Sequence, residues 1–244
     1  MGYWGYYVVG RSPRPLAELD ALAGAEGIRL WTRAAEGWQV WEYPTGMDED
    51  AGNVGNMNTL ARETGAPALF GYVMGSDCVV VEAAGPESGA WTTCLARRAM
   101  ARYLGAGDDE HGRSVEDYFL EPRDAAERAV AWAAEAGRIV VEQPLVDVLT
   151  SEPGPADPLA ENILFRLLDR LGVVSLWRSR VVARSKGRCV FRIAGAHCRA
   201  GPSGIRRDRG RRDEPGEADR PGRRTRSGGK RAGLFGPLCA ASRG

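Results

Sequence analysis

An abrupt change of composition near Gly172 most constrains how this chain of 244 residues folds. Residues 1–174 carry 14 basic and 27 acidic side chains, a net charge of −13, whereas residues 175–244 carry 19 basic and 5 acidic side chains, a net charge of +14. The formal charge of +1 for the whole chain therefore hides two oppositely charged blocks. We expect an acidic α+β globular domain at residues 1–174 and a basic low-complexity tail at residues 175–244.

The composition of the tail argues against a packed core. Arg, Gly, Ser and Pro supply 39 of its 70 residues, so few large apolar groups remain to offset the entropy lost on ordering the backbone. We expect most of this Arg/Gly-rich tail to be disordered. Residues 1–174 should fold without it, because a domain of about 170 residues buries roughly 70% of the surface of its unfolded chain.

Three interpretations of the tail stay open. In the first, the tail is an arm that binds nucleic acid, and in the second it lies on the acidic domain. In the third, it is a frame-shift or read-through product of GC-rich coding DNA, which the 31 Arg against 2 Lys of the chain indicate. Nucleic acid is a partner only if the tail is genuine. In that case the phosphate-binding candidates are arginines separated by Gly and Pro, namely Arg206, Arg207, Arg209, Arg211, Arg212, Arg223 and Arg224.

The first 84 residues predict the element order β-α-β-β-α-β-β. Aromatic and β-branched runs indicate strands, and apolar residues at helical spacing indicate helices. The strands are expected at residues 2–10, 28–33, 38–43, 67–74 and 78–84, and the helices at residues 13–24 and 50–64. The first strand is apolar on both faces, which predicts a central place in the sheet. The first six elements have the order of a ferredoxin-like split βαβ unit.

The rest of the domain is expected to be helical. Helices are predicted at residues 91–104, 122–137, 145–149 and 159–171, with a further helix start at Ser114. Gly75-Ser76, between the last two predicted strands, fits a two-residue turn of type II′, because glycine accepts a positive φ at its first position.

Few residues of the domain suggest catalysis. His111 is the one histidine of residues 1–174, and Cys94 lies near a predicted helix start, where unpaired backbone N–H groups lower a thiol pKa. These two residues are the candidates for the catalytic pair of a thiol or carboxylate hydrolase. Neither the cysteines nor the histidines have the spacing of a metal site, and we expect no metal and no cofactor.

Aromatic residues gather at the start of the chain, where 8 of the 19 aromatic side chains fall within the first 43 residues. Those left exposed would mark a surface for a protein or a small ligand. The binding candidates are Tyr3, Trp4, Trp31, Trp38, Trp41 and Tyr43.

The preferred hypothesis is an acidic binding or regulatory module that masks a basic protein partner, since a net charge of −13 attracts cationic partners. An enzyme is the less favoured alternative. No run of 18 apolar residues is present, and the start of the sequence lacks the pattern of a secretory signal. We therefore expect a cytoplasmic protein without a membrane partner.

Overall fold

The computed structural model describes residues 2–46, 52–105 and 114–175. All of them belong to one compact unit, residues 1–189. The predicted tail from residue 176 onward, with its candidate arginines, lies outside the described residues, as does His111.

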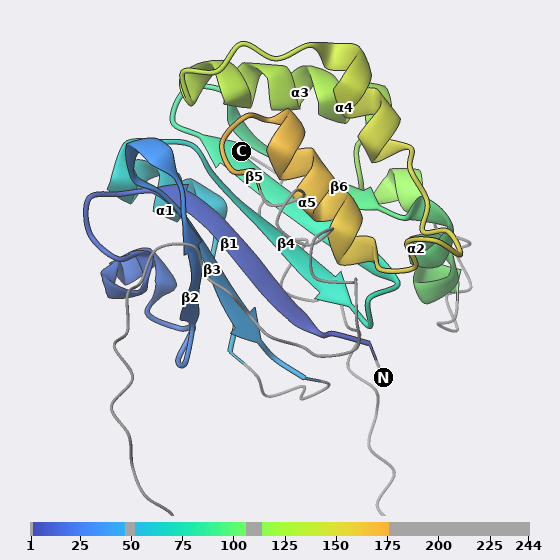
Figure 1. The fold of residues 1–244 in the computed structure, drawn as a ribbon, viewed down its shortest axis with the longest axis horizontal. Coiled ribbons are helices and arrows are strands. Elements are labelled where there is room, and N and C mark those ends of the chain that lie inside the picture. Colours follow the sequence, from blue (N-terminus) through green and yellow to red (C-terminus); the bar gives the residue numbers. More distant parts are fainter. Residues whose placement is uncertain (1, 47–51, 106–113, 176–244) are drawn as a thin grey trace, which may run out of the picture. The chain divides into compact units, whose positions relative to one another are not determined.

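An antiparallel sheet of six strands forms the centre of the described region (Figure 1). Its order is β2-β3-β1-β4-β5-β6. The strands are β1 (Gly5–Arg11), β2 (Arg29–Arg33), β3 (Trp38–Pro44), β4 (Ala68–Met74), β5 (Cys78–Gly85) and β6 (Gly89–Leu95). The α+β prediction, with the sheet in the N-terminal half and helices after it, is confirmed.

The first four strands have the order and directions that a split βαβ unit requires. β1 pairs antiparallel with β3 on one side and with β4 on the other, and β2 pairs antiparallel with β3. The central place predicted for the first strand is therefore confirmed. β5 and β6 extend the sheet beyond β4 through two hairpins.

The helices are α1 (Met57–Thr64), α2 (Arg97–Gly105), α3 (Pro122–Glu135), α4 (Glu142–Leu149) and α5 (Ala160–Arg170). Short 3₁₀ helices lie at η1 (Leu16–Glu18), η2 (Asp20–Leu22), η3 (Ala35–Gly37) and η4 (Val115–Asp117). The predicted helices at residues 122–137, 145–149 and 159–171 correspond to α3, α4 and α5.

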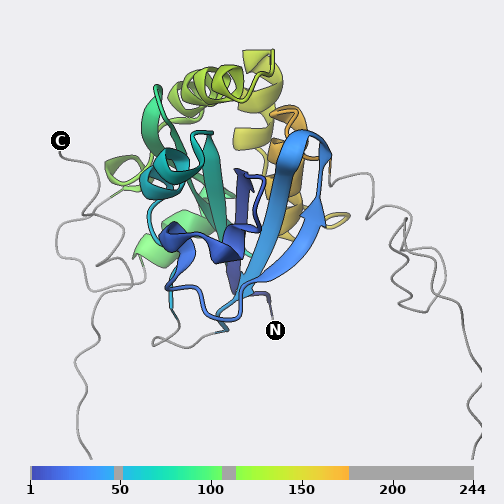
Figure 2. The same ribbon diagram turned by 90° about the vertical axis from the view of Figure 1, so that its left-hand side faces the viewer.

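Helices cover both faces of the sheet (Figures 1 and 2). We call the two faces the α1 face and the α5 face. A Cβ atom added at Gly10 would meet Leu16 and Leu60, which places η1 and α1 over one face. A Cβ atom added at Gly71 would meet Leu164 of α5, which places α5 over the other.

The core is largest on the α5 face. Trp38 of β3 packs on Trp132 of α3 with ring centroids 5.9 Å apart, and Tyr7 of β1 packs edge-on against Phe165 of α5 at 5.1 Å. The indole N–H of Trp132 also donates to the carbonyl oxygens of Ala68 and Ala84, at 3.1 Å each. This contact fixes α3 at the ends of β4 and β5.

The predicted helix at residues 91–104 is wrong in its first part. Gly89–Leu95 forms strand β6, paired with β5, and only Arg97–Gly105 is helical. Trp91, Thr93 and Leu95 lie on one face of β6, and Thr92 and Cys94 lie on the other. The two threonines are β-branched residues, which favour strands. The hydrogen-bonding edge of β5 decides between the two conformations.

Two other predicted helices differ from the expectation: one is shorter, and the other is replaced by 3₁₀ helices. α1 begins at Met57, after Asn56, whose side chain accepts a hydrogen bond from the backbone N–H of Asn58 at 2.7 Å. Gly55, with φ +69°, ends the irregular segment before it. The predicted helix at residues 13–24 forms the two 3₁₀ helices η1 and η2 instead.

The turn between β4 and β5 has a different type from the one predicted. Gly75 and Ser76 both have φ near +62°, and the N–H of Asp77 donates to the carbonyl oxygen of Met74 at 3.0 Å. Two positive φ angles define type I′ rather than type II′. Serine is unusual at this position, and its side chain makes contacts that glycine cannot make.

Candidate functional site

Three tyrosines from adjacent strands form a row across the α1 face. Tyr6 of β1 lies opposite Tyr43 of β3 and Tyr72 of β4 in the strand registers. The ring centroid of Tyr6 is 4.5 Å from that of Tyr72 and 6.3 Å from that of Tyr43. We call Tyr6, Tyr43 and Tyr72 the tyrosine row.

The rings of Tyr6 and Tyr72 are only half-buried, whereas Tyr43 is buried. Burial raises the pKa of the Tyr6 phenol, and the neighbouring phenols of Tyr72 and Tyr43 raise it further. Burial also raises the pKa of Tyr72, although a hydrogen bond with Thr45 acts in the opposite direction. Both phenols are therefore neutral at physiological pH and present hydroxyl groups and aromatic faces.

A buried carboxylate lies beside the tyrosine row. Glu82 of β5 is 9% exposed and lies directly opposite Phe70 of β4. Because Val80 lies opposite Tyr72, Glu82 is the diagonal neighbour of Tyr72 across the β4–β5 pair. Phe70 in turn meets Tyr6 edge-on at 5.3 Å. The row and the carboxylate thus lie on the same face of the sheet.

The N-terminus of α1 holds the carboxylate of Glu82. The backbone N–H of Met57, the first residue of α1, donates to Oε1 of Glu82 at 2.9 Å. An anion at this end of a helix is favoured by the helix dipole. Burial nevertheless raises the pKa of Glu82, with the Met57 hydrogen bond lowering it by less. Among the described residues, no Arg forms an ion pair with Glu82.

A second buried carboxylate lies on the α5 face and has a cationic partner. Glu42 of β3 is 5% exposed, and its Oε2 accepts from Nε of Arg29 at 3.0 Å and from Nη2 at 2.9 Å. Tyr3 lies within electrostatic reach of this pair and packs on Tyr7 at 5.4 Å. The α5 face therefore combines carboxylate, arginine and tyrosines.

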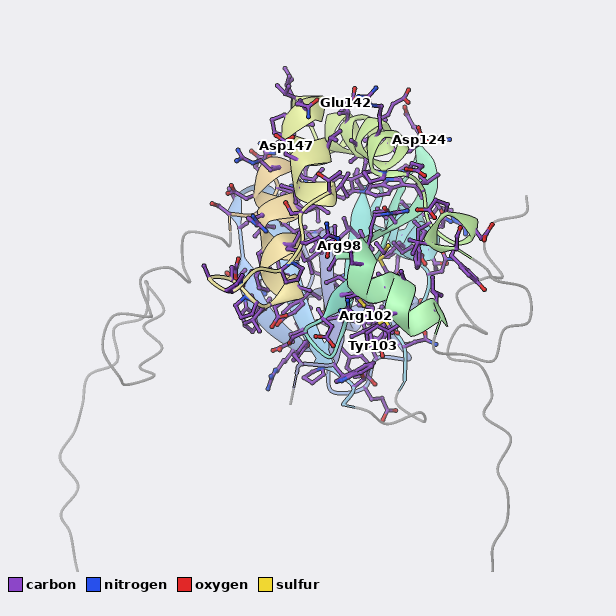
Figure 3. The ribbon with its side chains drawn as sticks, turned by 90° about the vertical axis from the view of Figure 1, so that its right-hand side faces the viewer. Arg98, Arg102, Tyr103, Asp124, Glu142 and Asp147 are labelled. Atoms are coloured by element: carbon purple, nitrogen blue, oxygen red, sulfur yellow. The ribbon has the colours of Figure 1, made fainter. Side chains whose placement is uncertain are left out.

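The six predicted aromatic binding residues do not form one site. Strand alternation sends Tyr3, Trp31 and Trp38 to the α5 face, where Trp31 packs against Phe165. On the α1 face, Trp41 is buried and donates its indole N–H to the buried Gln39. Trp4 meets Tyr103 of α2 edge-on at 6.3 Å, and Figure 3 shows Tyr103 with Arg98 and Arg102 on α2. Of the six, Tyr43 belongs to the tyrosine row.

The prediction did not name Tyr6, Tyr72 or Glu82. Glu82 is the single charged residue of the apolar run Cys78–Gly85, and a charge inside such a strand is a signal that the sequence contains. The two tyrosines carry no such signal, because they become neighbours only through the pairing of β1 with β4.

The environment of Cys94 does not activate its thiol. Cys94 lies on β6 rather than at a helix start and is 1% exposed. Burial raises its pKa to about 12, although the guanidinium of Arg97 lowers it in part. The same burial raises the pKa of Cys78 to about 12. The shift is opposite to the one expected from a helix N-terminus.

A separate polar cavity of about 470 Å³ lies near the C-terminal end of β1, with Arg11, Glu36 and Glu135 in its wall. Glu36 already binds the guanidinium of Arg138 through two hydrogen bonds of 3.2 and 3.0 Å. Glu135 accepts the backbone N–H groups of Glu87 and Ser88. Both carboxylates in the wall of this cavity thus already bind other parts of the protein.

Comparison of the chain with protein-family models, with curated proteins and with solved structures gives no significant match. Within the described residues, no three His, Cys, Asp or Glu side chains gather as metal ligands would. None of the helices in the described ranges is long and apolar enough to cross a membrane.

Proposed function

We propose that residues 1–174 form a binding or regulatory module that masks a basic protein partner in the cytoplasm. The single observation that supports this most is the pair of half-buried rings, Tyr6 and Tyr72, next to the buried carboxylate of Glu82. Aromatic faces and carboxylates both attract cations.

The charge of the domain supports the same kind of partner. Residues 1–174 have a net charge of −13, which speeds the encounter with a cationic surface at low ionic strength. Exposed acidic side chains also lie on α3 and α4, where Figure 3 shows Asp124, Glu142 and Asp147. These charges steer a partner, whereas the tyrosine row gives a place to bind it.

Fluorescence anisotropy of a labelled arginine-rich peptide with the full chain tests this function. The matched control is the same peptide with citrulline in place of arginine, which is neutral and nearly isosteric. We expect saturable binding of the arginine peptide that weakens at least about tenfold when the ionic strength rises from 0.05 to 0.5 M. Equal binding of the citrulline peptide, or no binding at low salt, would contradict the proposal.

A further inference from the structure

We infer that the tyrosine row and Glu82 receive one arginine side chain of the basic partner, with its guanidinium group against the Glu82 carboxylate and over the Tyr6 and Tyr72 rings. This inference rests on the proposed function and assigns the binding contact to one place on the α1 face.

The rings offer a surface suited to a planar cation. Tyr6 and Tyr72 lie 4.5 Å apart and tilted by 31°, so the two rings shield one another on one side. Both remain half-exposed, which leaves ring surface for a ligand. A guanidinium group stacks on such a surface within about 6 Å of the ring centroid and is more weakly hydrated than an ammonium group.

The carboxylate supplies the counter-charge. Oε1 of Glu82 accepts the N–H of Met57, a bond that fixes the carboxylate at the start of α1. A buried carboxylate without a cation is costly, and a cation with matching hydrogen bonds reduces this cost. Arginine fits this geometry because its N–H groups bind carboxylate oxygens side by side.

The α5 face shows the same combination with an arginine in place. There, Glu42 is buried, the guanidinium of Arg29 binds it through Nε and Nη2, and the ring of Tyr3 lies near the pair. On the α1 face, Glu82 and the tyrosine row repeat the carboxylate and the phenol rings. In the described parts of the chain, no arginine binds Glu82 as Arg29 binds Glu42. By this comparison, we assign the group that completes the α1 face to a guanidinium of the basic partner.

A single-residue probe tests this assignment on the full chain. Acetyl-arginine methylamide is titrated and followed by NMR shifts of the tyrosine ring protons, with acetyl-citrulline methylamide as the neutral control. We expect the arginine probe to bind at least about tenfold more tightly than the citrulline probe. The Glu82→Gln variant keeps the acceptor for the Met57 N–H but loses the charge, and should lose this preference.

The matched control variant is D124N/E142Q/D147N, which removes three exposed charges on α3 and α4 (Figure 3). It should bind the arginine probe within about twofold of the unmodified chain, because exposed charges are screened and interact weakly. The Tyr72→Leu variant, checked by circular dichroism for an intact fold, should weaken the arginine probe, whereas Tyr72→Phe keeps the ring and most of the binding.

The outcomes separate this inference from the proposed function. If Glu82→Gln binds the arginine probe as well as the unmodified chain does, the inference is wrong. If binding of the arginine-rich peptide is then lost only in the D124N/E142Q/D147N variant, the proposed function is retained, but the partner binds at a different site. If the full chain binds neither the arginine-rich peptide nor the probe, both the function and the inference are wrong.

Discussion

Oε1 of Glu82 lies 2.9 Å from the backbone nitrogen of Met57, so a carboxylate from strand β5 accepts a hydrogen bond from the first residue of α1. This bond ties the helix to the sheet beside the tyrosine row. It also places a charge where water has little access, which gives the bond a measurable dependence on pH.

We expect the protein to lose stability relative to the Glu82→Gln variant as the pH rises. Burial raises the pKa of Glu82 in the folded state, so the folded protein holds the proton more tightly than the unfolded chain does. The resulting stabilisation is complete below the ordinary glutamate pKa and is lost as the pH rises through the raised pKa, by at most about 1.4 kcal/mol per pH unit. Urea denaturation of both proteins between pH 4 and pH 8, in steps of about one pH unit, measures the difference in their free energies of unfolding. A difference independent of pH would contradict the shift.

We expect Cys78 and Cys94 to resist alkylation in the folded protein. With a thiol pKa of about 12, only about one molecule in 10,000 carries the reactive thiolate at pH 8. Iodoacetamide treatment followed by peptide mass spectrometry should find these two cysteines unmodified in the native chain and modified in urea. Rapid labelling of native Cys94 would restore the thiol hydrolase hypothesis.

Ser76→Ala should destabilise the protein by about 1–3 kcal/mol. The hydroxyl of Ser76 accepts the backbone N–H of Tyr3 at 2.8 Å and donates to Oε1 of the buried Glu161 at 3.2 Å. Alanine leaves both groups without this partner and keeps the positive φ. Thermal or urea unfolding measures the loss, with Ser76→Gly as the control. Glycine removes the same hydrogen bonds but relieves the backbone strain, so it should be less destabilising than alanine.

Gly71→Ala should cost about 1–3 kcal/mol, because the new methyl group overlaps the side chain of Leu164 in the α5 core. Leu164→Ala alone should cost about 2–5 kcal/mol by opening a cavity. In the double variant, the methyl group added at residue 71 partly fills that cavity. The free energy lost by the double variant should therefore be smaller than the sum of the two single losses. Additive losses would mean that β4 and α5 do not meet at these residues.

The sequence predicted the outline of the fold because that outline depends on local patterns. Apolar residues on both faces of Gly5–Arg11 indicated a central strand, and β1 lies between β3 and β4. Helical periodicity and terminal Gly or Pro residues located α3 and α5 to within a few residues. The strand order of the split βαβ unit followed from the order of the elements.

Local pattern did not predict β6, because Trp91–Leu95 fits both a helix and a strand. Its conformation depends on the free edge of β5, whose N–H and C=O groups pair with it. The same limit applies to the turn at Gly75-Ser76, where the contact of Ser76 with Glu161, 85 residues later in the chain, accompanies the positive φ angles.

The sequence by itself determined the acidic character of residues 1–174, the α+β class and the tyrosine-rich first strand. Tertiary structure alone decided which tyrosines meet. Alternation along β1 sends Tyr7 to the α5 face and Tyr6 to the α1 face, and the register of β4 then brings Tyr72 beside Tyr6. Strand registers are set by pairing between distant segments, so the position of Glu82 beside the tyrosine row exists only once the sheet has formed.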